Sequence, residues 1–109
     1  MQQGVTKKTQ KPGDGKTFPQ KGQTVAVHYR GELMDGTTFD SSVGKKPFTF
    51  RIGVGQVIRG WDEGVATMSV GEVALLRISP EYGYGAMGAP PSIPSNAELM
   101  FQVQLLGVQ

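Results

Sequence analysis

The fold is decided by residues 48–68, which read FTFRIGVGQVIRGWDEGVATM. The stretch begins with apolar side chains at every second position, Phe48, Phe50 and Ile52, which is the period of a strand that buries one face. Beyond the loop that follows, the period becomes helical, with apolar side chains at Ile58, Trp61, Val65 and Met68. The stretch therefore predicts a strand, a short loop and one amphipathic helix of two or three turns.

Acidic side chains mark the start of this helix, and a glycine marks its end. Asp62 and Glu63 lie in the first turn, where carboxylates interact favourably with the positive end of the helix dipole. Gly71 follows the last apolar residue of the helical pattern, so we expect the helix to end before it.

Alternating segments flank the helix on both sides along the chain. Upstream, Val25, Val27 and Tyr29 face one side of a strand. Asp35-Gly36 is a strong turn signal, so residues 23–34 should turn back into residues 37–39. Downstream, two further strands should pack on the helix through the faces formed by Ala74, Leu76 and Ile78 and by Phe101, Val103 and Leu105. Between them, residues 80–96 hold four of the seven prolines, which is typical of a long ordered loop that carries function.

Length and composition agree with these elements. With 109 residues, 16 glycines and 7 prolines, the chain can form one apolar core and many turns. We therefore expect a single domain spanning residues 1–109. Its fold class should be α+β, with one short helix covering the apolar face of an antiparallel sheet.

The composition excludes several kinds of site. Without cysteine, the chain has no disulfide, no thiol nucleophile and no thiolate metal site. His28 is the single histidine, so neither a zinc cluster nor a Ser-His-Asp relay has its partners, and we interpret it as a surface or edge residue. Residues 83–88 match GxGxxG, but Ala89-Pro90-Pro91 follows and cannot begin the helix that a dinucleotide site requires. We expect no metal and no cofactor.

Charge and hydropathy give expectations about partners and location. The formal net charge is +2, and the N-terminal lysines precede the aromatic region, which favours a solvated edge strand over a nucleic-acid surface. The first residues lack an apolar leader, and no apolar run approaches the length of a bilayer span. We therefore expect no nucleic-acid or membrane partner, and a cytoplasmic or nuclear location.

Seven aromatic side chains lie near the predicted loops: Tyr29, Phe39, Phe48, Trp61, Tyr82, Tyr84 and Phe101. Core packing accounts for most aromatic residues in a domain of this size. Trp61 is harder to explain in that way, because it is the one tryptophan and lies on a helix too short to need it. A filled core and a cleft lined by these rings both stay open at this point.

Six motifs follow one another along the chain: Val27-His28-Tyr29, Asp35-Gly36, Phe39-Asp40-Ser41-Ser42, Val57-Ile58-Arg59-Gly60-Trp61, Met68-Ser69-Val70-Gly71 and Pro80-Glu81-Tyr82-Gly83-Tyr84-Gly85. In this order and nearly this spacing, from about Gly4 to Val108, the chain resembles the FKBP family of immunophilin isomerases, which bind tacrolimus and rapamycin. The resemblance implies a five- or six-stranded antiparallel half-barrel wrapped around one short helix, with a cleft between them. It also implies peptidyl-prolyl cis/trans isomerase (rotamase) activity, used in protein folding, without metal, cofactor or covalent intermediate.

The same resemblance assigns the cleft position by position. It implies that substrate and drug are bound by Tyr29, Phe39, Asp40, Phe48, Gln56, Val57, Ile58, Trp61, Tyr84, Ile93 and Phe101. Catalytic roles fall to Tyr29, Asp40, Trp61, Tyr84 and Phe101. Trp61 would form the floor, while the Ile58 amide and the Tyr84 hydroxyl would donate to ligand carbonyls. For Asp40, a direct role on the amide and a role as the acceptor that orders Tyr29 both stay open.

Two interpretations of such a cleft remain. The protein either accelerates rotation about X-Pro bonds in proline-containing peptides and proteins, or it is a regulatory module that binds proline segments and macrolides, its isomerase activity being incidental. A drug complex could engage calcineurin, but Val43–Lys46, Ala89 and Ser92 depart from the usual family pattern, so we expect drug binding to survive better than calcineurin inhibition. We expect a monomer, with weak self-association as a further hypothesis if Ala89-Pro90-Pro91 inserts into a second molecule's pocket.

Overall fold

A computed structural model describes residues 4–109 and contains one sheet and one short α-helix. The strands are β1 (Val5–Lys11), β2 (Thr24–Leu33), β3 (Thr38–Ser41), β4 (Phe48–Arg51), β5 (Val73–Ile78) and β6 (Leu99–Val108). The helix α1 (Arg59–Gly64) lies between β4 and β5 in the sequence and continues into a 3₁₀ turn at Val65–Thr67. Two further 3₁₀ turns, Pro80–Tyr82 and Gly85–Met87, lie between β5 and β6.

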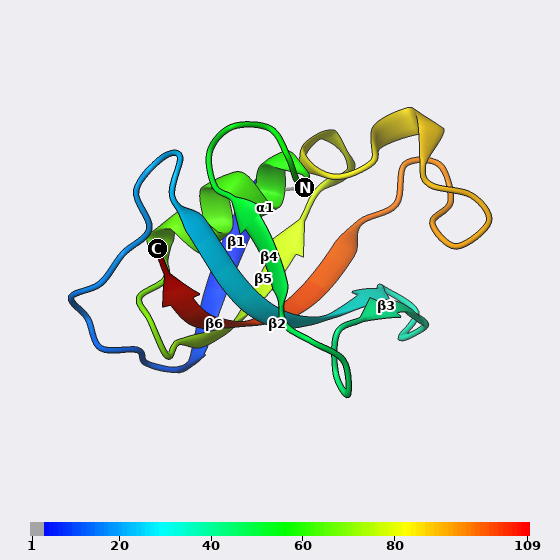
Figure 1. Cartoon of the computed structure of the whole chain (residues 1–109). Helices are drawn as coiled ribbons and strands as arrows, with labels where there is room; N and C mark the ends of the chain where they lie inside the picture. The colour runs from blue at the N-terminus through cyan, green and yellow to red at the C-terminus, as the bar shows by residue number, and fades with distance from the viewer. Residues whose placement is uncertain (1–3) are drawn as a thin grey trace.

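The sheet is antiparallel and open, with the strand order β1-β5-β6-β2-β3, and β4 also pairs with β2 (Figure 1). β4 lies beside the first half of β2, along Thr24–Val27, whereas β3 lies beside its second half, along Arg30–Glu32. β3 and β4 therefore occupy one edge of β2 in succession, interrupted by residues 42–47. The expected α+β half-barrel is confirmed, and it has six strands.

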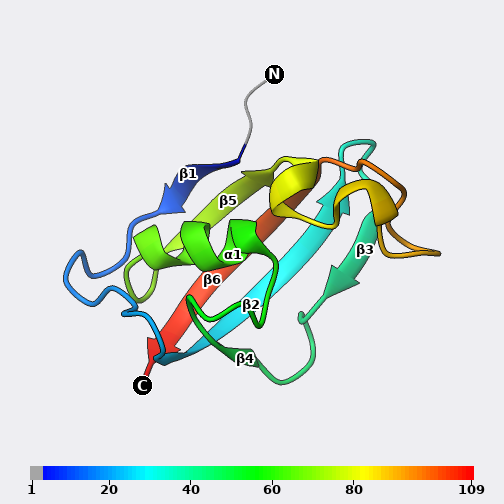
Figure 2. The same ribbon diagram turned by 90° about the horizontal axis from the view of Figure 1, so that it is seen from above.

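The helix lies across one face of the sheet, over β5 and β6 (Figure 2). The apolar faces predicted for β2, β5 and β6 are buried there, at Val25, Val27, Ala74, Leu76, Ile78, Phe101, Val103 and Leu105. The helix ends before Gly71, as expected. Nowhere in residues 4–109 is there a helix long and apolar enough to cross a membrane.

The strand at residues 48–52 differs from its predicted pattern at its first residue. Phe50 and Ile52 are 4% and 1% exposed, but Phe48 is 40% exposed although it shares their side of the strand. Phe48 is more exposed because it lines an open cleft, where its ring meets those of Tyr29 and Trp61 edge to face. The same geometry leaves Tyr29, at the far end of the buried face of β2, only partly buried.

The two remaining segments of interest are the lysine-rich start of the chain and the long loop before β6. β1 is an edge strand, as its lysines predicted, and it pairs with β5 alone. The loop at residues 80–96 is ordered by its 3₁₀ turns and by two backbone hydrogen bonds between Ala89 and Ile93, of 2.8 and 2.9 Å. Its tip projects from one end of the sheet, beyond β3 (Figure 1).

Candidate active site

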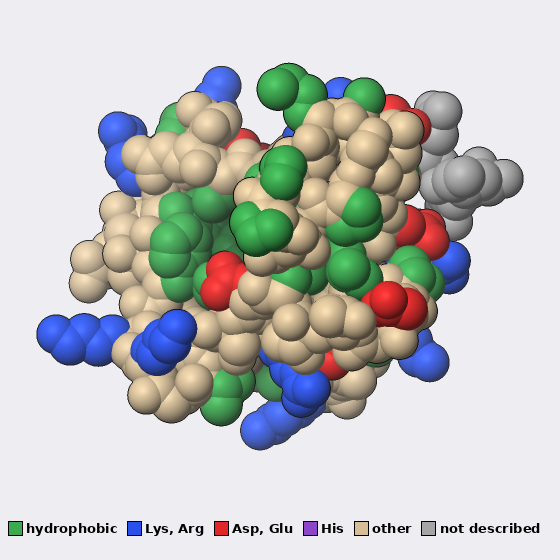
Figure 3. All heavy atoms as spheres, turned by 90° about the vertical axis from the view of Figure 1, so that its right-hand side faces the viewer, with side chains coloured by type: hydrophobic (Ala, Val, Ile, Leu, Met, Phe, Trp, Pro, Cys, Tyr) green, Lys and Arg blue, Asp and Glu red, His purple; other side chains and the backbone are tan. Residues whose placement is uncertain are grey.

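A cleft of about 460 Å³ opens between the helix, the sheet and the long loop. Its lining consists of Tyr29, Phe39, Asp40, Phe48, Gln56, Val57, Ile58, Trp61, Tyr84 and Phe101. These are ten of the eleven positions assigned from the sequence. The eleventh, Ile93, is outside this lining because its side chain is 4% exposed and belongs to the core under the long loop. On the face seen in Figure 3, apolar side chains gather in a hollow with an acidic group beside it.

Trp61 is the aromatic floor of the cleft, and neighbouring aromatic rings pack against it. Its ring lies 5.0 Å from that of Tyr29 and 5.2 Å from that of Phe101, at interplanar angles of 76° and 84°. Such edge-to-face arrangements are favourable because the positive edge of one ring meets the negative face of the other. The indole Nε1 is buried and has no nitrogen or oxygen acceptor within residues 4–109. The floor is therefore an aromatic ring packed among other rings, with its one polar atom buried.

The sheet side of the cleft depends on a residue that sequence reasoning missed, Gly31. A Cβ atom at this position would lie 2.6 Å from Cζ of Phe39 and 2.7 Å from Cε1 of Phe101, closer than real side-chain atoms approach. Phe39 and Phe101 meet edge to face at 5.4 Å directly above it. The sequence does offer one signal that could have identified Gly31: a glycine inside a strand often marks a place where another group approaches the backbone closely.

The polar part of the cleft is an ordered pair of side chains. The Tyr29 hydroxyl donates to Oδ2 of Asp40 at 2.7 Å, and the Ser41 amide donates to Oδ1 at 2.8 Å. Burial, together with the bond to Asp40 and its charge, raises the pKa of Tyr29 far above its ordinary value. Burial and the Asp40 charge also raise the pKa of Tyr84. Both phenols therefore stay protonated at neutral pH, and Asp40 has the position that the ordering role requires.

Two hydrogen-bond donors remain available to a ligand. The Tyr84 side chain is 40% exposed, and within residues 4–109 its hydroxyl has no hydrogen-bond partner. Ile58 immediately precedes the helix, and its carbonyl accepts from the amides of Trp61 and Asp62 at 2.9 and 3.2 Å. Amides at a helix start have no acceptor within the helix, and no side chain caps this one. The cleft can therefore bind an apolar ring and, beside it, a peptide carbonyl.

The geometry of residues 4–109 does not support the other kinds of site considered from the sequence. His28 lies on β2, outside the cleft lining, and its Nδ1 is 2.9 Å from Oγ of Ser42. In the described part of the chain, no three His, Cys, Asp or Glu side chains come together as metal ligands would. Residues 83–88 form turns rather than a strand-to-helix connection, so the GxGxxG match has no phosphate-binding geometry.

Known proteins resemble this chain over nearly its whole length. The family model described as FKBP-type peptidyl-prolyl cis-trans isomerase matches residues 15–106. FK506-binding protein 1A of Aspergillus fumigatus is 58% identical over 106 residues, which cover 96% of this chain and 95% of the relative. FK506-binding protein 1 of Rhizopus delemar is 56% identical over 106 residues, covering 96% and 98%. Peptidyl-prolyl cis-trans isomerase Fkbp12 of Drosophila melanogaster is 60% identical over 99 residues, covering 90% and 92%.

Proposed function

Because the chain belongs to the family of FKBP-type peptidyl-prolyl cis-trans isomerases, we propose that its aromatic cleft is where it binds X-Pro segments and catalyses their rotation. The resemblance drawn from the six motifs is confirmed, and so is the enzyme class. The position of Trp61 is the observation that carries the assignment of the site. Its ring, 4% exposed, forms the base of a cleft that five other aromatic side chains line.

The cleft can accelerate rotation without a nucleophile. Rotation about a peptide bond has a barrier of about 18–20 kcal/mol because resonance gives the C–N bond partial double-bond character. The planar amide is more charge-separated than the twisted one, so water stabilises the planar form more. A cleft that removes this water favours the twisted amide, and each 1.36 kcal/mol of such preference gives about a tenfold gain in rate.

Each part of the site has a place in this mechanism. The proline ring lies on Trp61, and Phe48 and Phe101 exclude water around it. The Ile58 amide and the Tyr84 hydroxyl donate to the carbonyls on either side of the bond that rotates. Asp40 accepts a hydrogen bond from the Tyr29 hydroxyl and so orders the wall of the cleft.

We propose that the same cleft binds tacrolimus and rapamycin, since two of the relatives above are named FK506-binding proteins and FK506 is tacrolimus. We expect drug binding to survive better than engagement of calcineurin by the drug complex. Val43 is 70% exposed, and Ala89 and Ser92 lie on the projecting loop. A change at these positions alters the surface that drug and protein together would present to calcineurin more than it alters the pocket itself.

The deciding experiment measures cis/trans exchange in a short Leu-Pro peptide, with and without rapamycin. The chain should accelerate exchange, rapamycin should abolish the acceleration, and Trp61→Ala and Phe101→Ala should each lose most of it. Rapamycin binding without acceleration would favour the regulatory binding module instead. Neither binding nor acceleration would mean that the site is elsewhere.

Weak self-association is a separate part of the proposal. Pro90 and Pro91 are exposed at the tip of the projecting loop, where a second molecule's cleft can reach them. Sedimentation velocity should then reveal dimers at millimolar protein that rapamycin dissociates. A sedimentation coefficient independent of concentration and drug would leave the chain a monomer.

A further inference from the structure

We propose that Asp62 is a positioning residue of the isomerase, although it lies outside the lining of the cleft. Its carboxylate fixes the loop between β4 and α1 and, through that loop, the cleft wall formed by Gln56, Val57 and Ile58. The inference rests on the proposal that this cleft binds the substrate.

Both oxygens of the Asp62 carboxylate are used on this loop. Oδ1 accepts the Gly53 amide at 2.9 Å, and Oδ2 accepts the Gly55 amide at 3.1 Å. From its position in the first turn, Asp62 was expected to complement the helix dipole. The structure places Asp62 in the first turn, as expected, but not Glu63. The Asp62 side chain does not cap the helix and reaches back across the preceding loop.

The loop needs such a tie because little else orders it. Gly53 and Gly55 both have positive φ, +78° and +80°, and glycine loses more conformational entropy on ordering than any other residue. Between them Val54 is 45% exposed, so its burial contributes little. A second tie joins the end of the loop to β4, where Oε1 of Gln56 accepts the Arg51 amide at 2.8 Å. Charge-assisted bonds from two amides to one carboxylate are the stronger of the two ties.

Order in this loop affects the reaction because the next residues form the cleft. Val57 and Ile58 follow directly after Gln56, and the Ile58 amide is one of the donors offered to the substrate. If the loop moves, binding must order it again, and this cost appears as weaker binding. Because the cost falls on binding rather than on the rotation itself, it should raise KM and leave kcat nearly unchanged.

The test compares Asp62→Asn and Asp62→Leu with the matched control Glu63→Gln. Asparagine keeps one carbonyl oxygen as an acceptor, whereas leucine has similar size and no acceptor. Glu63 is the neighbouring carboxylate, but it faces Arg59 in an exposed ion pair, so the control makes the same change of charge without touching the loop. Peptide exchange kinetics give KM and kcat, and amide NMR signals of Gly53, Gly55 and Ile58 report on the loop.

We expect KM to rise about tenfold in Asp62→Leu and less in Asp62→Asn, with kcat within about twofold of the parent. The glycine amide signals should move upfield and broaden in the same order, and Glu63→Gln should change neither readout. General destabilisation is recognised by chemical denaturation and does not produce this split between KM and kcat.

Two results would overturn the inference. Unchanged Gly53 and Gly55 signals in Asp62→Leu would mean that the carboxylate does not hold the loop. Changed signals with an unchanged KM would mean that the loop does not position the cleft. The proposed function fails in a different way, through full activity in Trp61→Ala, so the two failures can be told apart.

Discussion

Gly31 determines how much room the cleft has on its sheet side. The rings of Phe39 and Phe101 occupy the space that a side chain at this position would fill. Both rings line the cleft, where they pack edge to face on each other, and both approach the Gly31 backbone closely. A single methyl group at residue 31 therefore has to displace one ring or both toward the substrate.

We expect Gly31→Ala to reduce activity strongly and stability moderately. Overpacking of this kind costs about 1–3 kcal/mol of folding free energy, and the displaced rings narrow the cleft. Peptide exchange should fall about tenfold or more, measured beside urea denaturation. Gly107→Ala is the matched control, because this β6 glycine has no atom within 4 Å of the added methyl group. Full activity in Gly31→Ala would contradict this account of the wall.

At the residue scale, the sequence could predict side chains that belong to a motif but not those that act through space. Trp61, Tyr84 and the other cleft aromatics were reached through motif order. Gly31 and Asp62 were not, because their roles depend on which groups the fold brings against them. Asp62 was assigned to the helix dipole, since sequence distance favours the helix it stands on over a loop seven to nine residues away.

At the scale of elements, the contact between α1 and β5 sets the height of the cleft floor. Gly60 on the helix faces Ile78 on the strand, and an added Cβ would lie 2.7–2.8 Å from three Ile78 side-chain atoms. Ile78 is fully buried, so it cannot move aside freely. The helix, and with it the neighbouring Trp61, is therefore seated directly on the sheet.

We expect Gly60→Ala to destabilise the protein even though alanine is the better helix former. The propensity gain is about 1 kcal/mol, whereas overpacking against Ile78 costs about 1–3 kcal/mol, so a net loss of about 1 kcal/mol follows. Gly64→Ala is the comparison variant: its added methyl group would lie 3.0 and 3.1 Å from the Leu76 methyl groups, a milder crowding, so we expect a smaller loss. Thermal unfolding of both variants measures the difference. A Gly60→Ala protein more stable than its parent would contradict the predicted overpacking against Ile78.

The elements themselves were largely predictable, but their partners were less so. The period change at residues 48–68 correctly gave a strand followed by a helix. It could not give the succession of β3 and β4 along one edge of β2, because pairing between strands is not local in sequence. The count of five or six strands was open for this reason.

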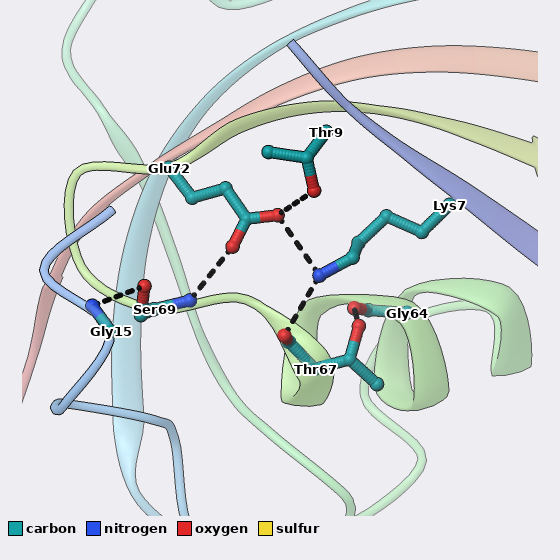
Figure 4. A network of polar contacts seen from close by, with 7 residues as sticks. All are labelled: Lys7, Thr9, Gly15, Gly64, Thr67, Ser69 and Glu72. Atoms are coloured by element: carbon teal, nitrogen blue, oxygen red, sulfur yellow. Dashed lines mark hydrogen bonds and ion pairs between the residues drawn. The ribbon is translucent and has the colours of Figure 1, made fainter. Parts of the chain in front are cut away.

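At the scale of the whole molecule, Glu72 joins segments that are distant in the sequence (Figure 4). Its carboxylate pairs with Lys7 at 2.9 Å, accepts the Thr9 hydroxyl at 2.8 Å, and accepts the Ser69 amide at 3.1 Å. Lys7 also donates to the carbonyl of Thr67 at the end of the helical segment. The edge strand β1, the end of the helix and the start of β5 are held together at one nearly buried carboxylate.

This arrangement predicts a loss of stability in acid that depends on Glu72. Burial alone would raise the pKa of Glu72, but the bonds from Lys7, Thr9 and Ser69 together hold it below its ordinary value of 4.5. A carboxylate with a lowered pKa contributes stability that is present above pH 4.5 and is lost as the pH falls through the folded-state pKa. The contribution is therefore full at neutral pH.

We expect Glu72→Gln to lower the free energy of unfolding by about 1.5–3 kcal/mol at pH 7, the range for hydrogen bonds to charged groups. The difference in the free energy of unfolding between parent and variant should hold down to about pH 5. It should shrink in stronger acid, where the parent's Glu72 is itself protonated. Urea denaturation between pH 3 and 7 measures both curves. Glu98→Gln, which breaks the more exposed pair with Arg77, is the control and should cost under about 1 kcal/mol. A gap that stays constant into acid would mean that Glu72 stabilises the fold by packing rather than by its charge.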